Sequence, residues 1–366
     1  MNTSARVFPA DYNNDGLMDV LVSGNPVQLW RNLGNGNFTN DATGLPAVNY
    51  GLAAWGDFNN DGWLDLAFGD TTNIYRNTGT NAFAAVPIIM NHTPFSYNSV
   101  AWGDYDGDGR LDLVRMGYGY AQLFHNAGTG TFTDSGFTPQ WGVFPVLGWA
   151  DLDNDGKAEL FVSGDNINYW NTDTGSFTYI YRYNGGTNFS IVSSNLLNLV
   201  RHGTVAFRDA DADGDLDILL AGNGPTGSTG RVYRNDGSFN FTNLGNLTPG
   251  VVRNAAWGDY NNDGLPDILA YGSQSTTVFV NLGNGAFTNI FANLPTVDEN
   301  GAAWADFDND GDLDILAGQL FSNLRPITNS PPLPPSGLSA VFTSNILLLS
   351  WNAPLDDTTS SNAFSY

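Results

Sequence analysis

Residues 53–69 read AAWGDFNNDGWLDLAFG, and this one stretch contains the features that decide the fold. A short apolar run ends in W-G-D, an acidic nine-residue loop begins at Asp57, and a second apolar run follows the loop. Short apolar segments separated by Gly, Asn and Asp are typical of β-strands joined by turns. The stretch therefore predicts two neighbouring strands with a polar loop between them.

The same stretch recurs along the whole chain. Its loop follows the pattern D-x-[DN]-x-D-G-x-x-[DE], with successive spacings of 46, 47, 47, 58, 50 and 47 residues. A third apolar segment such as NIYRN and a Phe-led fourth segment, as in LGNGAFTN, complete each unit. Four short strands per unit predict an all-β fold, a seven-bladed β-propeller. The seven loops begin at Asp11, Asp57, Asp104, Asp151, Asp209, Asp259 and Asp306.

The repeat also predicts the domain organisation. Residues 1–329 form the expected propeller, residues 330–337 a Pro-rich linker, and residues 338–366 a short C-terminal segment. The fourth unit is longer than the others, and its extra residues are expected near Asn166–Thr178 as an added hairpin or a long loop. The seventh unit is short, so its fourth strand is expected at 326–329 or is missing from this chain.

Each acidic loop has the ligand pattern of a metal site. Positions 1, 3, 5 and 9 carry side-chain oxygens, position 6 is always glycine, and position 7 is expected to offer its backbone carbonyl. These four side-chain positions hold 25 of the 37 acidic residues, which repel one another unless a cation lies between them. Ca²⁺ fits best because it accepts six to eight oxygens in irregular geometry. We expect about seven Ca²⁺ ions per chain, one in each loop.

The expected metal ligands are Asp11, Asn13, Asp15, Leu17, Asp19, Asp57, Asn59, Asp61, Trp63, Asp65, Asp104, Asp106, Asp108, Arg110, Asp112, Asp151, Asp153, Asp155, Lys157, Glu159, Asp209, Asp211, Asp213, Asp215, Asp217, Asp259, Asn261, Asp263, Leu265, Asp267, Asp306, Asp308, Asp310, Asp312 and Asp314. The fourth site is expected to be the weakest, because Glu159 is longer than Asp and Lys157 adds a positive charge. An EF-hand is excluded, since its position 12 requires Glu and these loops have none there. A metal-free Asx turn could explain one copy, but seven aligned copies favour a metal.

Charge and composition exclude several function classes. The chain has 13 basic and 37 acidic residues, a net charge of −24, which disfavours nucleic acid as a partner. It has no 18-residue apolar run, so membrane insertion is not expected. It has no cysteine, which rules out disulfides and thiolate metal sites. The first residues lack the apolar core of a signal peptide, so a mature form or a fragment is expected. The protein is expected to be monomeric or to be part of a longer multidomain chain.

The loops and the [YFW]-R-N-x-G-x-G-x-F segments resemble FG-GAP/VCBS repeats, relatives of the integrin α-subunit propeller, over roughly residues 5–329. The resemblance implies Ca²⁺ in the loop between the first two strands of each blade and a role in adhesion, matrix or glycan contact. Two units depart from the pattern. The fourth has Glu159 and a shifted third strand, YIYRYN, and the first has Phe8-Pro9-Ala10 in place of W-G.

Residues 338–366 resemble the opening strands of a fibronectin type III domain, with Trp351 as its core tryptophan. About thirty residues cannot bury a sandwich core on their own. A disordered tail is the alternative interpretation of this segment.

Repeated aromatic residues and the three histidines have structural explanations. A tryptophan two residues before the loop is expected to pack between blades rather than to stack on sugar, because five of the seven units repeat it and the fifth unit has Phe207 in its place. His125 replaces the Arg of Y-R-N and is expected to be structural, whereas His92 and His202 are expected in exposed inter-blade connections. These tryptophans are Trp55, Trp102, Trp149, Trp257 and Trp304.

The sequence predicts an extracellular or cell-surface propeller that binds a glycan or protein ligand. No zinc-protease motif and no nucleophile elbow is present, so no enzyme is expected. The alternatives are a propeller-based polysaccharide lyase or hydrolase, or its accessory domain, and a structural spacer. Ligand docking is expected on the face opposite the acidic loops, where unrepeated aromatics gather, unless these rings only seal the blades. They are Tyr50, Phe95, Tyr97, Tyr118, Tyr120, Trp141 and Phe144.

Overall fold

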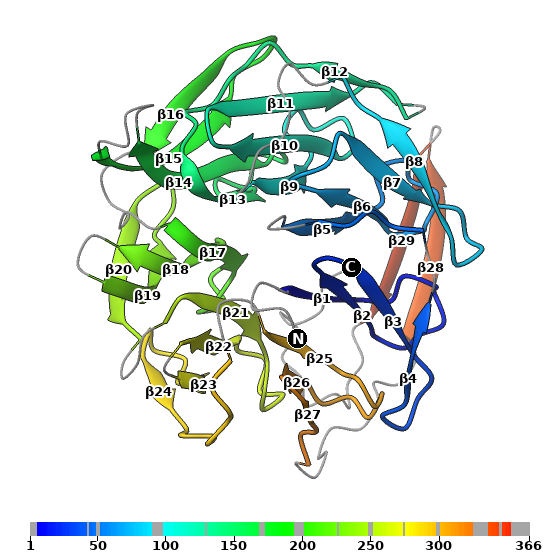
Figure 1. The fold of residues 1–366 in the computed structure, drawn as a ribbon, viewed down its shortest axis with the longest axis vertical. Coiled ribbons are helices and arrows are strands. Elements are labelled where there is room, and N and C mark those ends of the chain that lie inside the picture. Colours follow the sequence, from blue (N-terminus) through cyan, green and yellow to red (C-terminus); the bar gives the residue numbers. More distant parts are fainter. Residues whose placement is uncertain are drawn as a thin grey trace.

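The computed structural model describes residues 6–41, 44–48, 52–89, 98–128, 130–167, 173–193, 201–224, 227–247, 252–273, 275–297, 301–324, 336–343 and 346–352. Within these ranges every regular element is a β-strand, and the sheets are arranged as blades around a central axis (Figure 1). The predicted all-β seven-bladed propeller is confirmed.

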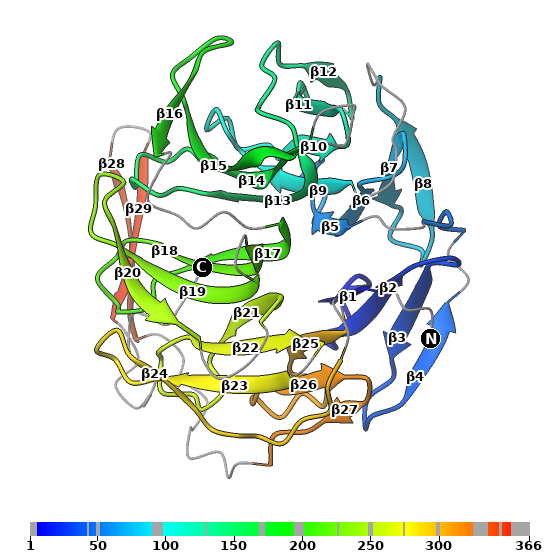
Figure 2. The ribbon, with the colours of Figure 1, turned by 60° about the vertical axis from the view of Figure 1, so that its left-hand side comes forward.

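Each blade is an antiparallel sheet whose strands follow one another in chain order. Blades 1 to 3 contain β1 (Arg6–Ala10), β2 (Asp19–Ser23), β3 (Gln28–Asn32), β4 (Phe38–Asp41), β5 (Ala53–Gly56), β6 (Asp65–Phe68), β7 (Asn73–Asn77), β8 (Phe83–Pro87), β9 (Ser99–Gly103), β10 (Asp112–Gly117), β11 (Tyr120–Asn126) and β12 (Phe132–Asp134). Blades 4 to 6 contain β13 (Val143–Ala150), β14 (Glu159–Ile167), β15 (Asp173–Tyr183), β16 (Phe189–Ser193), β17 (Arg201–Arg208), β18 (Asp217–Gly224), β19 (Gly227–Asn235), β20 (Phe241–Asn246), β21 (Asn254–Gly258), β22 (Asp267–Gly272), β23 (Ser275–Asn281) and β24 (Phe287–Asn289). Blade 7 contains β25 (Ala302–Ala305), β26 (Asp314–Ala317) and β27 (Leu320–Phe321). The last strands of the four-stranded blades, such as β20 and β24, lie at the rim (Figure 2).

Two sequence predictions concern the end of the chain. The expected fourth strand of blade 7, at 326–329, lies outside the described residues. Beyond it, β28 (Ser336–Thr343) and β29 (Ile346–Asn352) pair as an antiparallel hairpin. A hairpin alone does not identify a fibronectin type III domain, so that resemblance stays a prediction.

The ring closes by packing between the first and the last blade. The first strands contact one another in the order β1, β5, β9, β13, β17, β21 and β25, and β25 contacts β1. Each apolar cluster of the described residues lies between two neighbouring blades, and the cluster between blades 7 and 1 contains Val20, Ala305 and Phe307. Because none of the clusters formed by the described residues lies within a single blade, the blades stabilise one another as in other repeat proteins.

The repeated tryptophans pack between blades, as predicted. The indole Nε1 of Trp102 donates to the carbonyl of Ala54 in the preceding blade at 3.1 Å. The same ring lies so close to Gly56 that an added Cβ would be 2.8 Å from its Cδ1 atom. Gly103 meets Trp149 in the same way. The W-G pair is thus an inter-blade contact, in which the glycine of one blade makes room for the tryptophan of the next.

A second repeated contact uses the asparagine that ends the third strand. The Asn77 side-chain amide donates to the carbonyl of Tyr12 in the preceding blade at 2.8 Å, and the Asn77 backbone N–H donates to Asp65. Six blades share this arrangement within the described residues, and we call these side chains the clasp asparagines. They are Asn32, Asn77, Asn126, Asn235, Asn281 and Asn323.

The fourth blade lacks a clasp asparagine. Tyr183 pairs with Phe189 at the position where the other blades place the asparagine, and its ring contacts Tyr105 of blade 3 edge-on at 5.0 Å. The shifted YIYRYN segment therefore replaces a hydrogen bond with an aromatic contact. The extra residues of this unit, expected near 166–178 as an added hairpin or a long loop, instead lengthen the second and third strands, since β14 and β15 pair as far as Ile167 and Asp173.

No helix among the described residues is long and apolar enough to cross a membrane.

Candidate metal centres

All seven acidic loops lie on one face of the ring. Each loop follows the first strand of its blade and precedes the second, as Asp57 follows β5 and Asp65 opens β6. Because the first strands line the centre side by side, their carboxyl ends share one face (Figure 1). The structure therefore brings the predicted ligands of each loop together within that loop, on a common surface.

The seven loops have one backbone conformation. The glycine at position 6 has a φ between +82° and +95° in every loop, a region that side chains with a Cβ rarely adopt. Position 4 is also left-handed, with φ between +54° and +75°. Five loops place Asn there, the residue that best tolerates this conformation after glycine. The residues at position 4 are Asn14, Asn60, Gly107, Asn154, Ala212, Asn262 and Asn309.

The first carboxylate of each loop organises the turn. In the second loop, the backbone N–H groups of Asp61 and Gly62 donate to Asp57 at 3.0 and 2.7 Å. The N–H of Trp63 donates to Asp61 at 3.0 Å. Positions 1 and 5 are thus oriented by the backbone, which leaves each carboxylate free to place a lone pair toward the loop centre.

The carboxyl at position 9 is buried in every loop. Asp65 is fully buried and accepts hydrogen bonds from the N–H groups of Phe58 and Asn77, at 3.2 and 2.8 Å. Burial raises the pKa of six of these carboxyls to about 7, and the other carboxylates of the same loop raise it further. The six are Asp19, Asp65, Asp112, Glu159, Asp217 and Asp267, and burial also raises the pKa of Asp314.

The carboxylate at position 3 is less completely satisfied than those at the other positions. In the four loops with Asp at this position, one buried oxygen has no hydrogen-bond partner among the described residues. In each of these loops the acidic ligand atoms of positions 1, 3 and 9 lie within 4.8 Å of one another. Buried charge without a partner is costly, so an oxygen-binding cation fits this space. The four residues are Asp106, Asp153, Asp211 and Asp308.

The other three loops place Asn at position 3. Asn59 Nδ2 donates to Asp61 at 2.9 Å, so its amide oxygen remains as the acceptor of that side chain. Asn13 and Asn261 make the same contact in their loops. These loops have one carboxylate fewer but the same four oxygen-bearing side chains, and Ca²⁺ also accepts amide oxygens.

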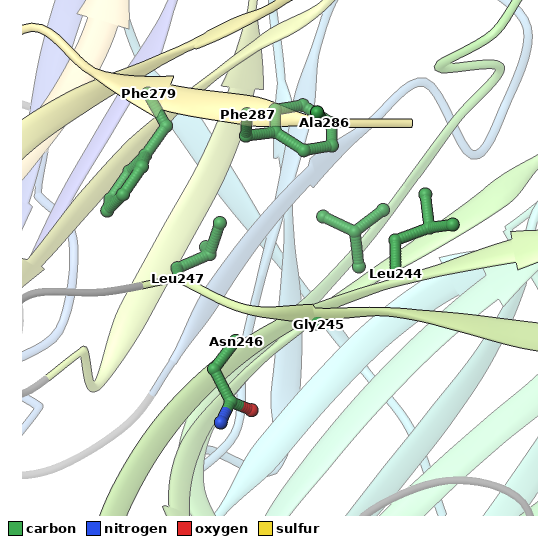
Figure 3. A pocket seen from close by; sticks show the side chains of 8 residues that line it. Leu244, Gly245, Asn246, Leu247, Phe279, Ala286 and Phe287 are labelled. Carbon is green, nitrogen blue, oxygen red and sulfur yellow. The ribbon is translucent and has the colours of Figure 1, made fainter. Parts of the chain in front are cut away.

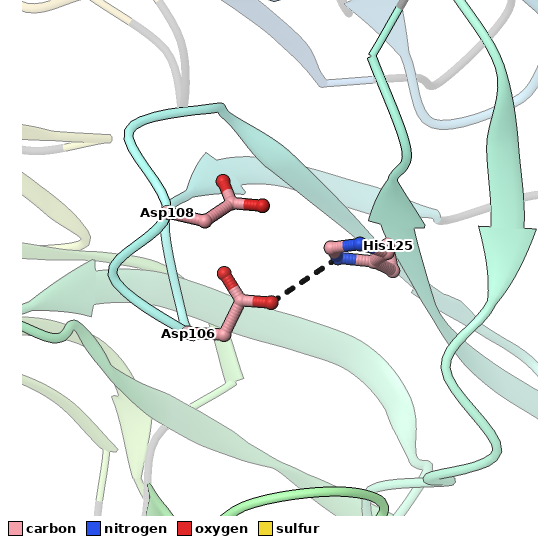
Figure 4. Close-up of side chains that lie close together, drawn as sticks. All are labelled: Asp106, Asp108 and His125. Carbon is pink, nitrogen blue, oxygen red and sulfur yellow. Dashed lines mark ion pairs between the residues drawn. The ribbon is translucent and has the colours of Figure 1, made fainter.

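Basic side chains enter the loops of blades 3 and 4. Arg182 forms ion pairs with Asp153 and Asp155, both at 2.8 Å. His125 Nδ1 lies 3.3 Å from Asp106, and its ring points toward that carboxylate with Asp108 beside it (Figure 4). Both residues occupy the Arg position of the Y-R-N segment. In blade 5 the equivalent Arg234 pairs instead with Asp236, outside the loop.

Neighbouring loops are also joined to one another, which the sequence did not reveal. Asn14 Nδ2 donates to the Gly62 carbonyl of the next loop at 2.9 Å, and Asn60 Nδ2 donates to the Gly109 carbonyl at 3.0 Å. The position 4 asparagine therefore has two roles, a left-handed turn and a bridge between blades. Its repetition in five units was the signal that could have predicted it.

The residues expected on the opposite face have different surroundings. Tyr50, Phe95, Tyr97 and His92 lie outside the described residues. Tyr120 is buried, Trp141 packs against the core of blades 3 and 4, and Tyr118 is exposed. Phe144 stacks on His202 with ring centroids 3.5 Å apart. The prediction that His202 is an exposed loop histidine is wrong, because it lies within β17 and is half-buried by this contact.

A cavity of about 200 Å³ lies between the outer strands of blades 5 and 6 (Figure 3). It is smaller than typical ligand pockets, and none of its lining residues is charged. It is therefore a packing gap between blades rather than a ligand site. The lining residues are Val232, Leu244, Gly245, Asn246, Leu247, Phe279, Ala286 and Phe287.

Fold and loops together define the class, a seven-bladed β-propeller built from acidic-loop repeats. The FG-GAP-like repeat family matches residues 11–68, 57–115, 106–162, 209–270 and 259–317, and the chain belongs to this family. None of the curated proteins matches the chain.

Solved structures resemble this chain at low sequence identity, and two of them do so with a TM-score above 0.5. A structure of an Agrocybe aegerita lectin that recognises non-reducing terminal N-acetylglucosamine is 21% identical, with a TM-score of 0.52 over 78% of this chain and 79% of that chain. A structure of BBS1N in complex with ARL6DN is 11% identical, with a TM-score of 0.56 over 90% of this chain and 94% of that chain. A rhamnogalacturonan lyase from Bacillus licheniformis is 14% identical, with a TM-score of 0.37 over 88% of this chain and 75% of that chain. At these identities the similarity concerns the fold, and a fold alone does not fix function.

Proposed function

We propose that this protein is a calcium-loaded propeller that works outside the cytoplasm as a binding or adhesion module for a glycan or protein ligand. The observation that carries the calcium assignment is the unpartnered buried oxygen at position 3, seen in Asp106, Asp153, Asp211 and Asp308. A hard cation would satisfy this oxygen and neutralise the carboxylates around it.

The chain's own residues would hold the ion in the same way in each loop. Positions 1, 3, 5 and 9 would supply side-chain oxygens, and the position 7 carbonyl would complete the set, as with Trp63 in the second loop. When bound, Ca²⁺ supplies positive charge and rigidity and no redox chemistry. The position 9 carboxylate would connect the ion to the clasp asparagine, and through it to the preceding blade.

The proposed location outside the cytoplasm is consistent with the family and with calcium binding. FG-GAP-like repeats are typical of extracellular proteins, and extracellular calcium modules function with dissociation constants of about 10⁻⁴ to 10⁻³ M. Dissociation constants of this size suit loops on the surface of an acidic protein. Seven bound Ca²⁺ ions would also reduce the net charge of −24 to about −10.

The binding role is proposed because the repeated residues account for the loop face, while the opposite face carries unrepeated residues such as Tyr118 and Phe144. Variable segments on a rigid scaffold are where ligands usually bind. A glycan array probed in calcium buffer tests the role directly. Selective binding to one glycan class supports it, and release of unsaturated sugar products from a bound polysaccharide would favour the lyase alternative instead.

A further inference from the structure

Blade 3 carries a histidine at a position where the other blades have no nitrogen ligand. The residue is His125, which ends the third strand together with the clasp Asn126. The equivalent residue is arginine in blades 1, 2, 4 and 5, valine in blade 6 and serine in blade 7. A guanidinium has only N–H donors, whereas an imidazole nitrogen can offer a lone pair to a metal ion. The third acidic loop therefore has access to a nitrogen ligand in addition to its own carboxylates.

His125 Nδ1 lies close to two carboxylates that the fold brings together. The atom is 3.3 Å from Asp106 Oδ2 in the loop and 3.3 Å from Asp112 Oδ1 at the start of β10. Asp108 belongs to the same cluster, since one ligand atom each of Asp106, Asp108 and His125 lie within 4.8 Å of one another. The ring of His125 is directed from β11 toward the loop that carries both aspartates (Figure 4). Ligand atoms from the loop, β10 and β11 thus gather in one small volume.

Two atoms of this cluster are buried without a hydrogen bond. They are His125 Nδ1 and Asp106 Oδ1, and neither has a hydrogen-bond partner among the described residues. Nδ1 is near two carboxylate oxygens, yet the ring is not oriented to donate to either of them. Buried polar atoms usually have partners, so two such atoms in one cluster indicate that a common partner is missing. A cation bound to both side chains would satisfy them together.

The surroundings hold these ligand groups in place. Tyr105 contacts the ring of His125 edge-on, with ring centroids 6.1 Å apart. Asp112 is fully buried, and its Oδ1 accepts a hydrogen bond from the backbone N–H of Asn126 at 2.7 Å. Groups that are fixed before binding lose less conformational entropy when an ion arrives. The cluster is therefore suited to bind an ion without rearrangement.

A guanidinium makes the third loop less suited to calcium than the others. Arg110, at position 7, forms an ion pair with Asp108 and donates from Nε to the Asn126 carbonyl at 2.9 Å. It competes with a bound ion for the carboxylate at position 5, whereas the second loop has Trp63 at position 7. Ca²⁺ takes oxygen ligands in proteins, and imidazole suits ions such as Zn²⁺. Replacing an oxygen ligand by a nitrogen ligand shifts the preference toward such ions.

We propose that His125, Asp106 and Asp112 bind a divalent transition-metal ion, with Zn²⁺ as the test case, in the third loop in preference to Ca²⁺. Ligand atoms that share a tetrahedral ion at about 2.0–2.1 Å lie about 3.3 Å apart. Nδ1 has this separation from both carboxylate oxygens. Asp104 is available as a fourth ligand, because its carboxylate lies within 4.8 Å of those of Asp106 and Asp112. This inference rests on the proposed function, since it gives one of the proposed calcium loops a different ion.

The experiment titrates Zn²⁺ into the whole chain in saturating Ca²⁺ and measures binding by calorimetry. The variants are His125→Gln and His125→Arg, the second of which restores the residue found in four other blades. The matched controls are His92→Gln and His202→Gln, which remove the other two histidines one at a time. Side-chain nitrogen NMR of the histidines reports which imidazole binds the ion. Melting curves in Ca²⁺ verify that each variant is folded.

We expect one Zn²⁺ ion per chain to bind in the presence of Ca²⁺ and to shift the nitrogen resonances of His125. Both His125 variants should lose at least about tenfold in Zn²⁺ affinity, since even the partners of metal ligands contribute that much. Their stabilisation by Ca²⁺ should remain, and the two controls should bind Zn²⁺ like the parent protein.

No Zn²⁺ binding in the presence of Ca²⁺, equal affinity in the parent and the His125 variants, or a shift of a different histidine would overturn the inference. The proposed function is judged separately, by Ca²⁺ alone. If Ca²⁺ still raises the melting temperature of the parent protein, the calcium assignment stands without the zinc site. If neither ion binds, the calcium assignment fails as well.

Discussion

Asn77 shows how one side chain connects a loop to the ring. Its backbone N–H donates to the position 9 carboxylate of its own blade, and its amide donates to a carbonyl of the preceding blade. Asn77→Ala leaves the buried Tyr12 carbonyl without this donor, and we expect a loss of about 1–3 kcal/mol in the free energy of unfolding. Denaturant unfolding in calcium buffer measures it.

The fourth blade offers the control for this prediction. Asn184 follows the displaced clasp position and is exposed, and its side-chain hydrogen bonds within the described part of the chain go to Arg182 and Ser190 of the same blade. Asn184→Ala should change stability by less than about 0.5 kcal/mol. Equal losses in the two variants would show that the clasp contributes nothing beyond an ordinary surface asparagine.

Arg182 predicts which loop binds calcium least tightly. Its guanidinium pairs with Asp153 and Asp155, two of the expected ligands, so a Ca²⁺ ion must displace it. We expect native mass spectrometry at limiting calcium to show one site that fills last, and Arg182→Gln to remove this difference. Arg234→Gln is the control, because Arg234 pairs outside its loop. Seven equivalent sites in the parent protein would contradict the prediction.

At the scale of the loop, the buried position 9 carboxyls make stability depend on pH. Their folded pKa of about 7 lies above the ordinary pKa of 3.8 for Asp, so between these two pH values the folded metal-free protein binds more protons than the unfolded chain. Stability without metal is therefore present at low pH and is lost as pH rises through about 7. In EDTA, we expect a higher melting temperature at about pH 5.5 than at about pH 8.

Calcium should reverse this trend. The ion binds the deprotonated carboxylates and competes with protons, so the calcium-loaded protein should gain stability as pH rises over the same range. Melting curves at both pH values, with calcium and with EDTA, separate the two cases. A metal-free protein that melts higher at pH 8 than at pH 5.5 would show that these carboxyls are not destabilising when charged.

The loops and blades could be predicted from the sequence because their signals are local and repeated. The ligand spacing around Asp57 lies within nine residues, and seven copies remove chance as an explanation. The bridge from Asn14 to Gly62 and the stacking of Phe144 on His202 join residues 48 and 58 positions apart. Such contacts depend on how blades are rotated against each other, which composition and periodicity do not encode.

The conformation of His202 is the clearest case of a feature that the sequence did not predict. His202 follows a segment with no strand pattern, and its φ of +48° arises from a register shift between β17 and β18. The shift depends on how β17 and β18 pair, which the residue pattern before β17 does not encode.

The whole ring should depend on calcium for its stability, because every interface is bordered by loops. A ligand that binds only the folded state adds about 2.7 kcal/mol per site at a hundredfold excess over its dissociation constant. Chelation should therefore lower the melting temperature sharply, and restoring calcium should recover it. Identical melting curves in EDTA and in millimolar calcium would show that the loops are not structural metal sites.

The location of the ions tests the central claim most directly. Crystals grown in millimolar calcium, measured at a wavelength where calcium scatters anomalously, would show each bound ion as a separate peak. The account predicts peaks within the acidic loops in contact with positions 1, 3, 5 and 9, with the weakest peak beside Arg182 and Glu159. Anomalous density in fewer than half of the seven loops would contradict the account. Density that lies only outside the loops, with none beside Asp106, Asp153, Asp211 and Asp308, would contradict it as well.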